Sequence, residues 1–143
     1  MTIPQISVFL ENKAGQLADI TGILSENDVN MRAINIAETA DYGVLRLIVD
    51  DASKASSILL EQGFILTMTP VVGVAVPDTP GGLSKVLAVI STAGIDVEYM
   101  YSVFGQKDGQ ASMIFRVADT DSLGAVFEKN GITMISGEDL GLH

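Results

Sequence analysis

The stretch that decides the fold is "PDTPGGLSKVLAVISTAGIDV", Pro77–Val97, in which two adjacent glycines lead directly into an apolar series. The apolar residues recur at helical spacing, so the stretch predicts a helix that begins near Leu83 and lays one apolar face on a sheet. Gly81 stands where the loop meets this helix. Glycine is favoured there because its backbone can adopt positive φ, and because without a Cβ another group can approach its N–H closely.

The same pattern occurs earlier in the chain, in "ISVFLENKAGQLADITGILSENDVNM", Ile6–Met31. When the two stretches are aligned, Gly15 falls on Gly81 and Leu17 on Leu83, and the other apolar helix positions coincide at the same offset. The segments that follow also match each other. The chain therefore consists of two copies of one structural unit.

Each copy predicts the same order of elements. An alternating apolar strand precedes the loop glycine, a helix follows it, and then come two strands, a second helix and a closing strand. The order βαββαβ is that of ferredoxin-like folds, so we expect an α+β protein in which each unit is an antiparallel sheet with its helices on one face. The predicted domains are residues 1–70 and 71–143. The paired central strands are expected at residues 31–37 and 44–49, and at residues 97–104 and 111–117. Pro70 is expected to separate the last strand of one unit from the first strand of the next.

Composition excludes several classes of function. The 143 residues are 48% apolar and 18% charged, which is typical of a globular chain. A net charge of −10 argues against nucleic acid or a membrane surface as a partner. No basic leader and no run of about 20 apolar residues is present, so a soluble protein is expected. Cysteine is absent and the only histidine is His143, which leaves almost no material for a catalytic triad or a metal site and suits a reducing cytoplasm.

The two glycine loops indicate a site for a small zwitterion. The first N–H groups of a helix lack internal partners and lie at the positive end of its dipole, so they favour an anion such as an amino-acid carboxylate. An oxygen-bearing side chain that could accept from an ammonium group precedes each loop, Asn12 in the first copy and Asp78 in the second. The alternative interpretation is that the glycines only make the turn. Repetition of the loop on the same scaffold favours binding.

At these residues the chain resembles the ACT domain family, small-molecule-sensing modules attached to many enzymes of amino-acid metabolism. The resemblance lies in "ENKAGQLADITGILSENDVNMRAINI" and "PDTPGGLSKVLAVISTAGIDVEYM" and covers nearly the whole chain as a stand-alone tandem pair. It implies that an amino-acid effector lies between paired units, held by the loop after the first strand and by the start of the second strand of a neighbouring unit. By position, the implied ligand-binding residues are Asn12, Ala14, Gly15, Gln16, Leu17, Asn30 and Met31, and Asp78, Pro80, Gly81, Gly82, Leu83, Asp96 and Val97. Ala14 stands where the family commonly has proline, and Asp96 where it often has asparagine.

Other polar candidates have structural interpretations. The acidic residues before the second helix of each copy are expected to cap it: Asp50 and Asp51, and Asp119 and Asp121. "SGEDLG" near the end is expected to be a solvated tail, and His143 to be disordered rather than a ligand.

Two tyrosines and two arginines leave alternatives open. Tyr99 and Tyr101 alternate onto one side of a strand, where they either line a pocket or cover the open face of the sheet, and packing is favoured. Arg46 and Arg116 either pair with a carboxylate at an interface or remain solvated edge charges. The methionines are expected to fill the core.

These patterns predict a cytoplasmic regulatory protein that binds a free amino acid, with no catalytic residue, cofactor or metal. Units of about 70 residues bury little surface alone, so the halves are expected to pack together as an intrachain pseudodimer, with their sheets side by side, or to form a homodimer. Binding would favour one arrangement of the units, an allosteric change that a partner metabolic enzyme could read. The alternative hypothesis is a ligand-independent interaction module that recruits or regulates such an enzyme. An enzyme that uses Asp78 or Asp96 as acid or base is a third hypothesis, weakly motivated without histidine or cysteine.

Overall fold

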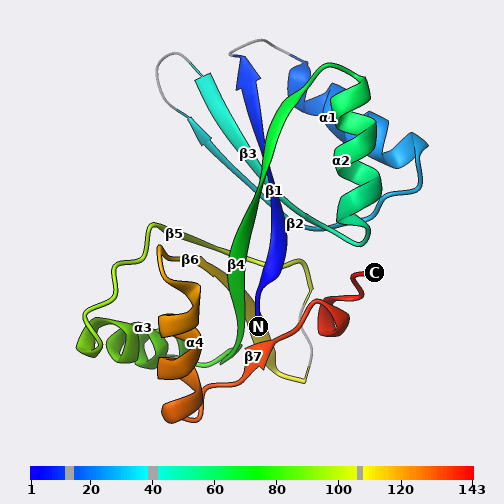
Figure 1. The fold of residues 1–143 in the computed structure, drawn as a ribbon. Coiled ribbons are helices and arrows are strands. Elements are labelled where there is room, and N and C mark those ends of the chain that lie inside the picture. The colour runs from blue at the N-terminus through cyan, green and yellow to red at the C-terminus, as the bar shows by residue number, and fades with distance from the viewer. Residues whose placement is uncertain (12–14, 39–41, 106–107) are drawn as a thin grey trace. The chain divides into compact units, whose positions relative to one another are not determined.

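The computed structural model describes residues 1–11, 15–38, 42–105 and 108–143 (Figure 1). Its elements in chain order are β1 (Ile3–Glu11), α1 (Gln16–Glu26), β2 (Met31–Glu38), β3 (Tyr42–Val49), α2 (Ala52–Glu61), β4 (Ile65–Pro77), α3 (Gly82–Thr92), β5 (Tyr99–Ser102), β6 (Gln110–Arg116), α4 (Thr120–Lys129), β7 (Met134–Ile135) and the short 3₁₀ helix η1 (Glu138–Leu140). The expected α+β class, with two βαββαβ-like units, is confirmed.

The chain divides into two compact units that exchange short terminal segments. The N-terminal unit consists of Pro4–Thr69 together with Leu140–His143, and the C-terminal unit of Pro70–Asp139 together with Met1–Ile3. Strand β4 therefore gives its first residues to one unit and its later residues to the other.

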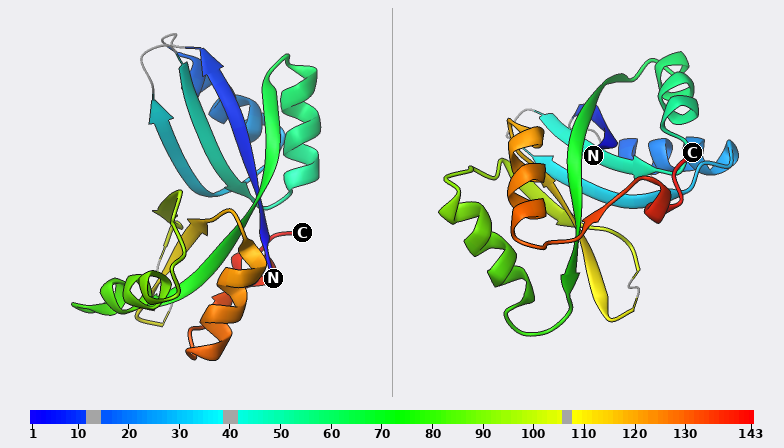
Figure 2. Two further views of the ribbon diagram at one scale, coloured as in Figure 1. Left: turned by 60° about the vertical axis from the view of Figure 1, so that its left-hand side comes forward. Right: turned by 60° about the horizontal axis from the view of Figure 1, so that its bottom comes forward.

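In the N-terminal unit the strand order is β2-β3-β1-β4, and α1 and α2 cover one face of the sheet (Figures 1 and 2). β3 pairs antiparallel with β1 and with β2. Successive side chains of a strand point to opposite faces, so the alternation predicted for β1 places Ile6, Val8 and Leu10 toward the helices. They share a core with Ile20 and Leu24 of α1.

The C-terminal unit repeats this plan with the order β4-β6-β5, and β7 pairs with β4. Its core joins the later part of β4 to α3 and α4. Phe115 and Phe127 are both fully buried there, with ring centroids 6.2 Å apart in an edge-to-face arrangement. β5 covers only Tyr99–Ser102, shorter than the predicted strand at 97–104.

The second helix of each unit begins at an aspartate, as predicted. Asp51 accepts a hydrogen bond from the Lys54 N–H at 3.1 Å, and Asp119 accepts one from the Ser122 N–H at 3.0 Å. The Ser122 hydroxyl, followed by the Ser122 N–H, lowers the pKa of the Asp119 carboxyl below its ordinary value. The prediction that Asp50 also caps α2 is wrong, because its Oδ1 accepts instead from the Asn30 N–H at 3.0 Å. Asp121 lies in the first turn of α4 rather than at its cap.

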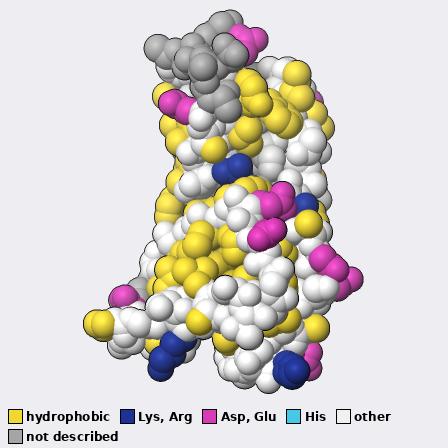
Figure 3. Space-filling view, turned by 90° about the vertical axis from the view of Figure 1, so that its left-hand side faces the viewer, with side chains coloured by type: hydrophobic (Ala, Val, Ile, Leu, Met, Phe, Trp, Pro, Cys, Tyr) yellow, Lys and Arg dark blue, Asp and Glu magenta, His cyan; other side chains and the backbone are white. Residues whose placement is uncertain are grey.

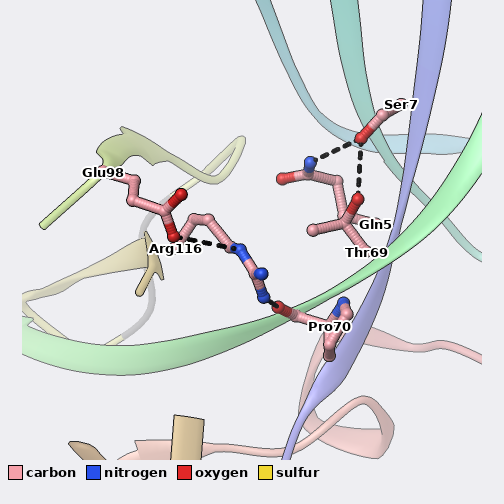
Figure 4. A network of polar contacts seen from close by, with 6 residues as sticks. All are labelled: Gln5, Ser7, Thr69, Pro70, Glu98 and Arg116. Carbon is pink, nitrogen blue, oxygen red and sulfur yellow. Dashed lines mark hydrogen bonds and ion pairs between the residues drawn. The ribbon is translucent and has the colours of Figure 1, made fainter. Parts of the chain in front are cut away.

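Pro70 does not separate two strands, so that prediction is wrong. β4 runs through it without a break from Ile65 to Pro77. Proline fits an extended backbone wherever its missing N–H is not needed in a ladder. Its carbonyl oxygen still accepts a hydrogen bond, at 2.8 Å from Nη1 of Arg116 (Figure 4).

The chain end is ordered, against the prediction of a solvated tail. Ser136 and Asp139 bond reciprocally, the Ser136 N–H to Asp139 Oδ2 at 2.9 Å and the Asp139 N–H to Ser136 Oγ at 3.1 Å. Leu140 is only 5% exposed. The backbone N–H of His143 donates to the Asp50 carbonyl oxygen at 2.7 Å, so His143 is not disordered, although its side chain is exposed. Burial of the apolar Leu140 side chain explains the order, because it removes that surface from water.

Candidate ligand site

The two loop glycines adopt the same unusual backbone conformation. Gly15 has φ 85° and ψ −11°, and Gly81 has φ 87° and ψ −8°, each directly before the first residue of its helix. This confirms the prediction of positive φ at both positions. A Cβ built at either glycine would meet no heavy atom of the described residues within 4 Å.

The second glycine of the pair, Gly82, is needed for a different reason. Its φ is not positive, but a Cβ there would collide with the carbonyl oxygen of Pro77. Its N–H donates to the Thr79 carbonyl oxygen at 3.0 Å inside the loop. Gly81 therefore provides the bend, and Gly82 lets the helix start close to the end of β4. In the first copy Gln16 holds the place of Gly82, so the two loops are not packed alike.

The helices that follow these glycines begin without a side-chain cap. The N-cap residues of α1 and α3 are glycines, which supply no side-chain cap, whereas α2 and α4 are capped by their aspartates. Uncapped first-turn N–H groups keep their hydrogen-bonding capacity and the positive potential of the helix terminus.

A pocket of about 190 Å³ lies beside Gly15 in the N-terminal unit. Three of the predicted site residues line it, Gly15, Gln16 and Leu17. Its other walls come from the ends of β1 and β2 and the start of β3, which the sequence patterns did not indicate: Leu10, Glu11, Ile36, Glu38, Tyr42 and Gly43. The predicted residues Asn12 and Ala14 lie outside the described residues.

The other two residues predicted for this site, Asn30 and Met31, lie at the opposite end of α1 from Gly15. A helix of eleven residues is about 16 Å long, and Asn30 and Met31 follow its C-terminal end. The Asn30 N–H donates to Oδ1 of Asp50, and the Asp50 N–H donates to the Asn30 carbonyl oxygen. Met31 packs against the core. A single unit therefore does not bring the loop and the start of β2 together.

The C-terminal unit separates its predicted residues in the same way. Asp78 and Pro80 are exposed in the loop, where the Asp78 N–H donates to the Gly109 carbonyl oxygen at 3.0 Å. Leu83 is half-buried against the core. Asp96 and Val97 line an open pocket of about 270 Å³ at the C-terminal end of α3.

The arginine and tyrosine candidates have structural partners within their own units. Arg116 binds the Pro70 carbonyl oxygen and lies 3.5 Å from Oε2 of Glu98 through Nε (Figure 4). Arg46 donates to Oδ1 of Asn35 at 3.0 Å. Tyr99 and Tyr101 stack with centroids 6.4 Å apart, and Tyr101 is only 7% exposed, which favours packing over a pocket role.

Within the described ranges, no cluster of three or more His, Cys, Asp or Glu side chains is arranged to hold a metal ion. In the same part of the chain no helix has the length and apolar character needed to span a bilayer.

Comparison with known proteins places the chain in a family. The model of the ACT domain pair matches residues 1–142. Protein BT0572 from Bacteroides thetaiotaomicron is 38% identical, over 99% of this chain and 96% of that one, with a TM-score of 0.91. The chain therefore belongs to the ACT domain pair family, as the resemblance indicated.

More distant structures share the fold. The regulatory subunit of aspartate kinase from Thermus thermophilus, in its ligand-free form, is 17% identical, with 88% and 91% of the two chains covered and a TM-score of 0.61. The corresponding subunit from Thermus flavus is 16% identical, with 87% and 90% covered and a TM-score of 0.53. No protein with a curated description matches the chain.

Proposed function

We propose that this protein is a non-catalytic regulator that binds a free amino acid as its effector. The observation that carries the proposal is the contrast between the helix starts. The N-cap residue of α1 and of α3 is a glycine in the left-handed conformation, which provides no side-chain cap. The N-cap residue of α2 and of α4 is an aspartate whose side chain caps the helix. In the proposed complex the α-carboxylate accepts from the first-turn N–H groups.

Membership of the ACT domain pair family supports an effector role. Two proteins that share the fold are named as regulatory subunits of aspartate kinase, which supports a metabolic enzyme as the partner that reads the bound state. The loop of one unit and the start of β2 lie at opposite ends of α1, so a site made of both requires a neighbouring unit, within the chain or in a homodimer. An effector that touches both units would favour the arrangement in which both contacts form.

Calorimetric titration of the full chain with each of the twenty amino acids tests the proposal. We expect one chemically related group of amino acids to release or absorb heat saturably, and the rest to give none. Uniformly flat titrations at millimolar ligand would remove the sensing function.

A ligand-independent interaction module is the second candidate, favoured by apolar side chains at the surface of the N-terminal unit (Figure 3). Phe9 and Tyr42 are 43% and 50% exposed and lie on the same face of the paired strands β1 and β3. Capture of a partner enzyme by the immobilised chain, with and without added amino acids, separates the two functions. This candidate predicts the same capture in both conditions.

A further inference from the structure

The pocket beside Gly15 exists because three strands leave one side-chain position empty. Leu10 of β1 and Glu38 of β2 both pair with Gly43 of β3. Paired residues of neighbouring strands point to the same face, so Leu10 and Glu38 flank a position that has no side chain. The first turn of α1, with Gln16 and Leu17, closes the pocket on another side. The volume of this pocket is about 190 Å³.

The backbone conformation at position 43 does not require glycine. What Gly43 contributes is the space left by its missing side chain. Its φ is not in the positive range. A Cβ built there would lie 3.5 Å from the Ala37 carbonyl oxygen and 3.9 Å from the Leu10 Cβ, which are ordinary contacts. The fold can therefore accept a side chain at this position, and the pocket is what that side chain would fill.

The charged groups of the pocket wall are all acidic among the described residues. The charged side chains that line it, within the part of the chain that the structure describes, are those of Glu11 and Glu38. The wall formed by the described residues therefore carries two carboxylates beside the positive terminus of α1.

The other described residues of the wall are apolar apart from the Gln16 amide and the Tyr42 hydroxyl. Leu17 and Ile36 are 38% and 45% exposed, so they can still bury surface against a ligand. Oε1 of Gln16 is buried and has no hydrogen-bond partner among the described residues.

We infer that this pocket selects amino acids with a cationic side chain, and that Glu38 is the residue that determines this specificity. The inference rests on the proposed function and adds the chemical class of the effector. The α-carboxylate of the ligand accepts from the first-turn N–H groups of α1, and its methylene stem packs on Leu17 and Ile36. The cationic end of its side chain pairs with the Glu38 carboxylate. An acidic side chain would meet two carboxylates and is excluded.

Calorimetry on the full chain with L-lysine, L-arginine, L-leucine and L-glutamate tests the inference. We expect wild type to bind lysine and arginine about tenfold more tightly than leucine, the effect of one charge-assisted contact, and glutamate most weakly. Glu38→Gln should weaken lysine binding about tenfold and change leucine binding by less than about twofold. Glu61→Gln, an exposed carboxyl on α2 away from the pocket, is the matched control and should bind like wild type.

A steric variant tests the location independently. Gly43→Val should abolish binding at this pocket, and Gly43→Ala, the milder change, should weaken it if the valine variant fails to fold. Gly22→Ala in α1, where a Cβ meets nothing within 4 Å, controls for a glycine replacement in the same unit.

The outcomes distinguish failure of the assigned specificity from failure of the proposed amino-acid-binding function. If no amino acid binds wild type, the proposed function fails and the inference with it. If amino acids bind but lysine is not preferred, or Glu38→Gln weakens lysine and leucine equally, the assigned specificity is wrong and the regulatory function stands. Unchanged lysine binding by a folded Gly43 variant would place the site elsewhere.

Discussion

Gly15 and Gly81 hold the same left-handed backbone conformation, φ 85° and 87°, at the starts of α1 and α3. Their loops differ at the next position, where the first copy has Gln16 and the second has Gly82. The bend is thus a common feature of the two units, while the packing behind it is particular to each one.

Replacement of the bend glycines should cost stability. Gly15→Ala and Gly81→Ala should each lower the free energy of unfolding by about 1–2 kcal/mol, because an L-residue is strained at positive φ. Gly22→Ala, inside α1, should instead raise it by up to about 1 kcal/mol. Denaturant titrations measure all three. Equal effects at Gly15 and Gly22 would contradict the role assigned to the bend.

Gly82 should be less tolerant than a glycine with open surroundings. Gly82→Ala should destabilise the protein by about 1–3 kcal/mol, because the Pro77 carbonyl oxygen belongs to the backbone and cannot turn aside. Gly124→Ala in α4 is the control, since its Cβ would meet only the Met134 Sδ, at 3.7 Å. Thermal unfolding followed by circular dichroism compares them, and a Gly82→Ala variant as stable as wild type would refute the steric argument.

Asp119 should stabilise the fold in a pH-dependent way. Its folded-state pKa is lowered by the Ser122 hydroxyl and N–H, so its contribution is complete above the unfolded-state pKa of about 3.9 and is lost as the pH falls through the folded value. Asp119→Ala should therefore be less stable than wild type at neutral pH, and the difference should shrink in acid. Unfolding measured at several pH values checks this.

The ordered chain end should depend on one apolar anchor. Leu140→Ala should lower the free energy of unfolding by about 2 kcal/mol or more, because Leu140 is 5% exposed. Leu60→Ala, at a position that is 56% exposed, should have a much smaller effect. Amide hydrogen exchange provides a second readout, since loss of the anchor should also deprotect the His143 N–H that donates to Asp50.

The sequence alone determined the features that depend on neighbours along the chain. The repeat, the βαββαβ order, the positive φ of Gly15 and Gly81, and the caps at Asp51 and Asp119 all follow from local spacing and backbone chemistry. Such features need only a few consecutive residues, so a pattern can reveal them.

Only the tertiary structure decided the features that join distant segments. Leu10 and Glu38 flank the empty position at Gly43 through strand register, and no pattern along the chain links these three positions. Pro70 lies inside β4 rather than between two strands, and the chain end is ordered because the Leu140 side chain is buried. The physical reason is the same in each case: pairing and burial depend on which residues meet in space, and that is fixed only when the whole chain has folded.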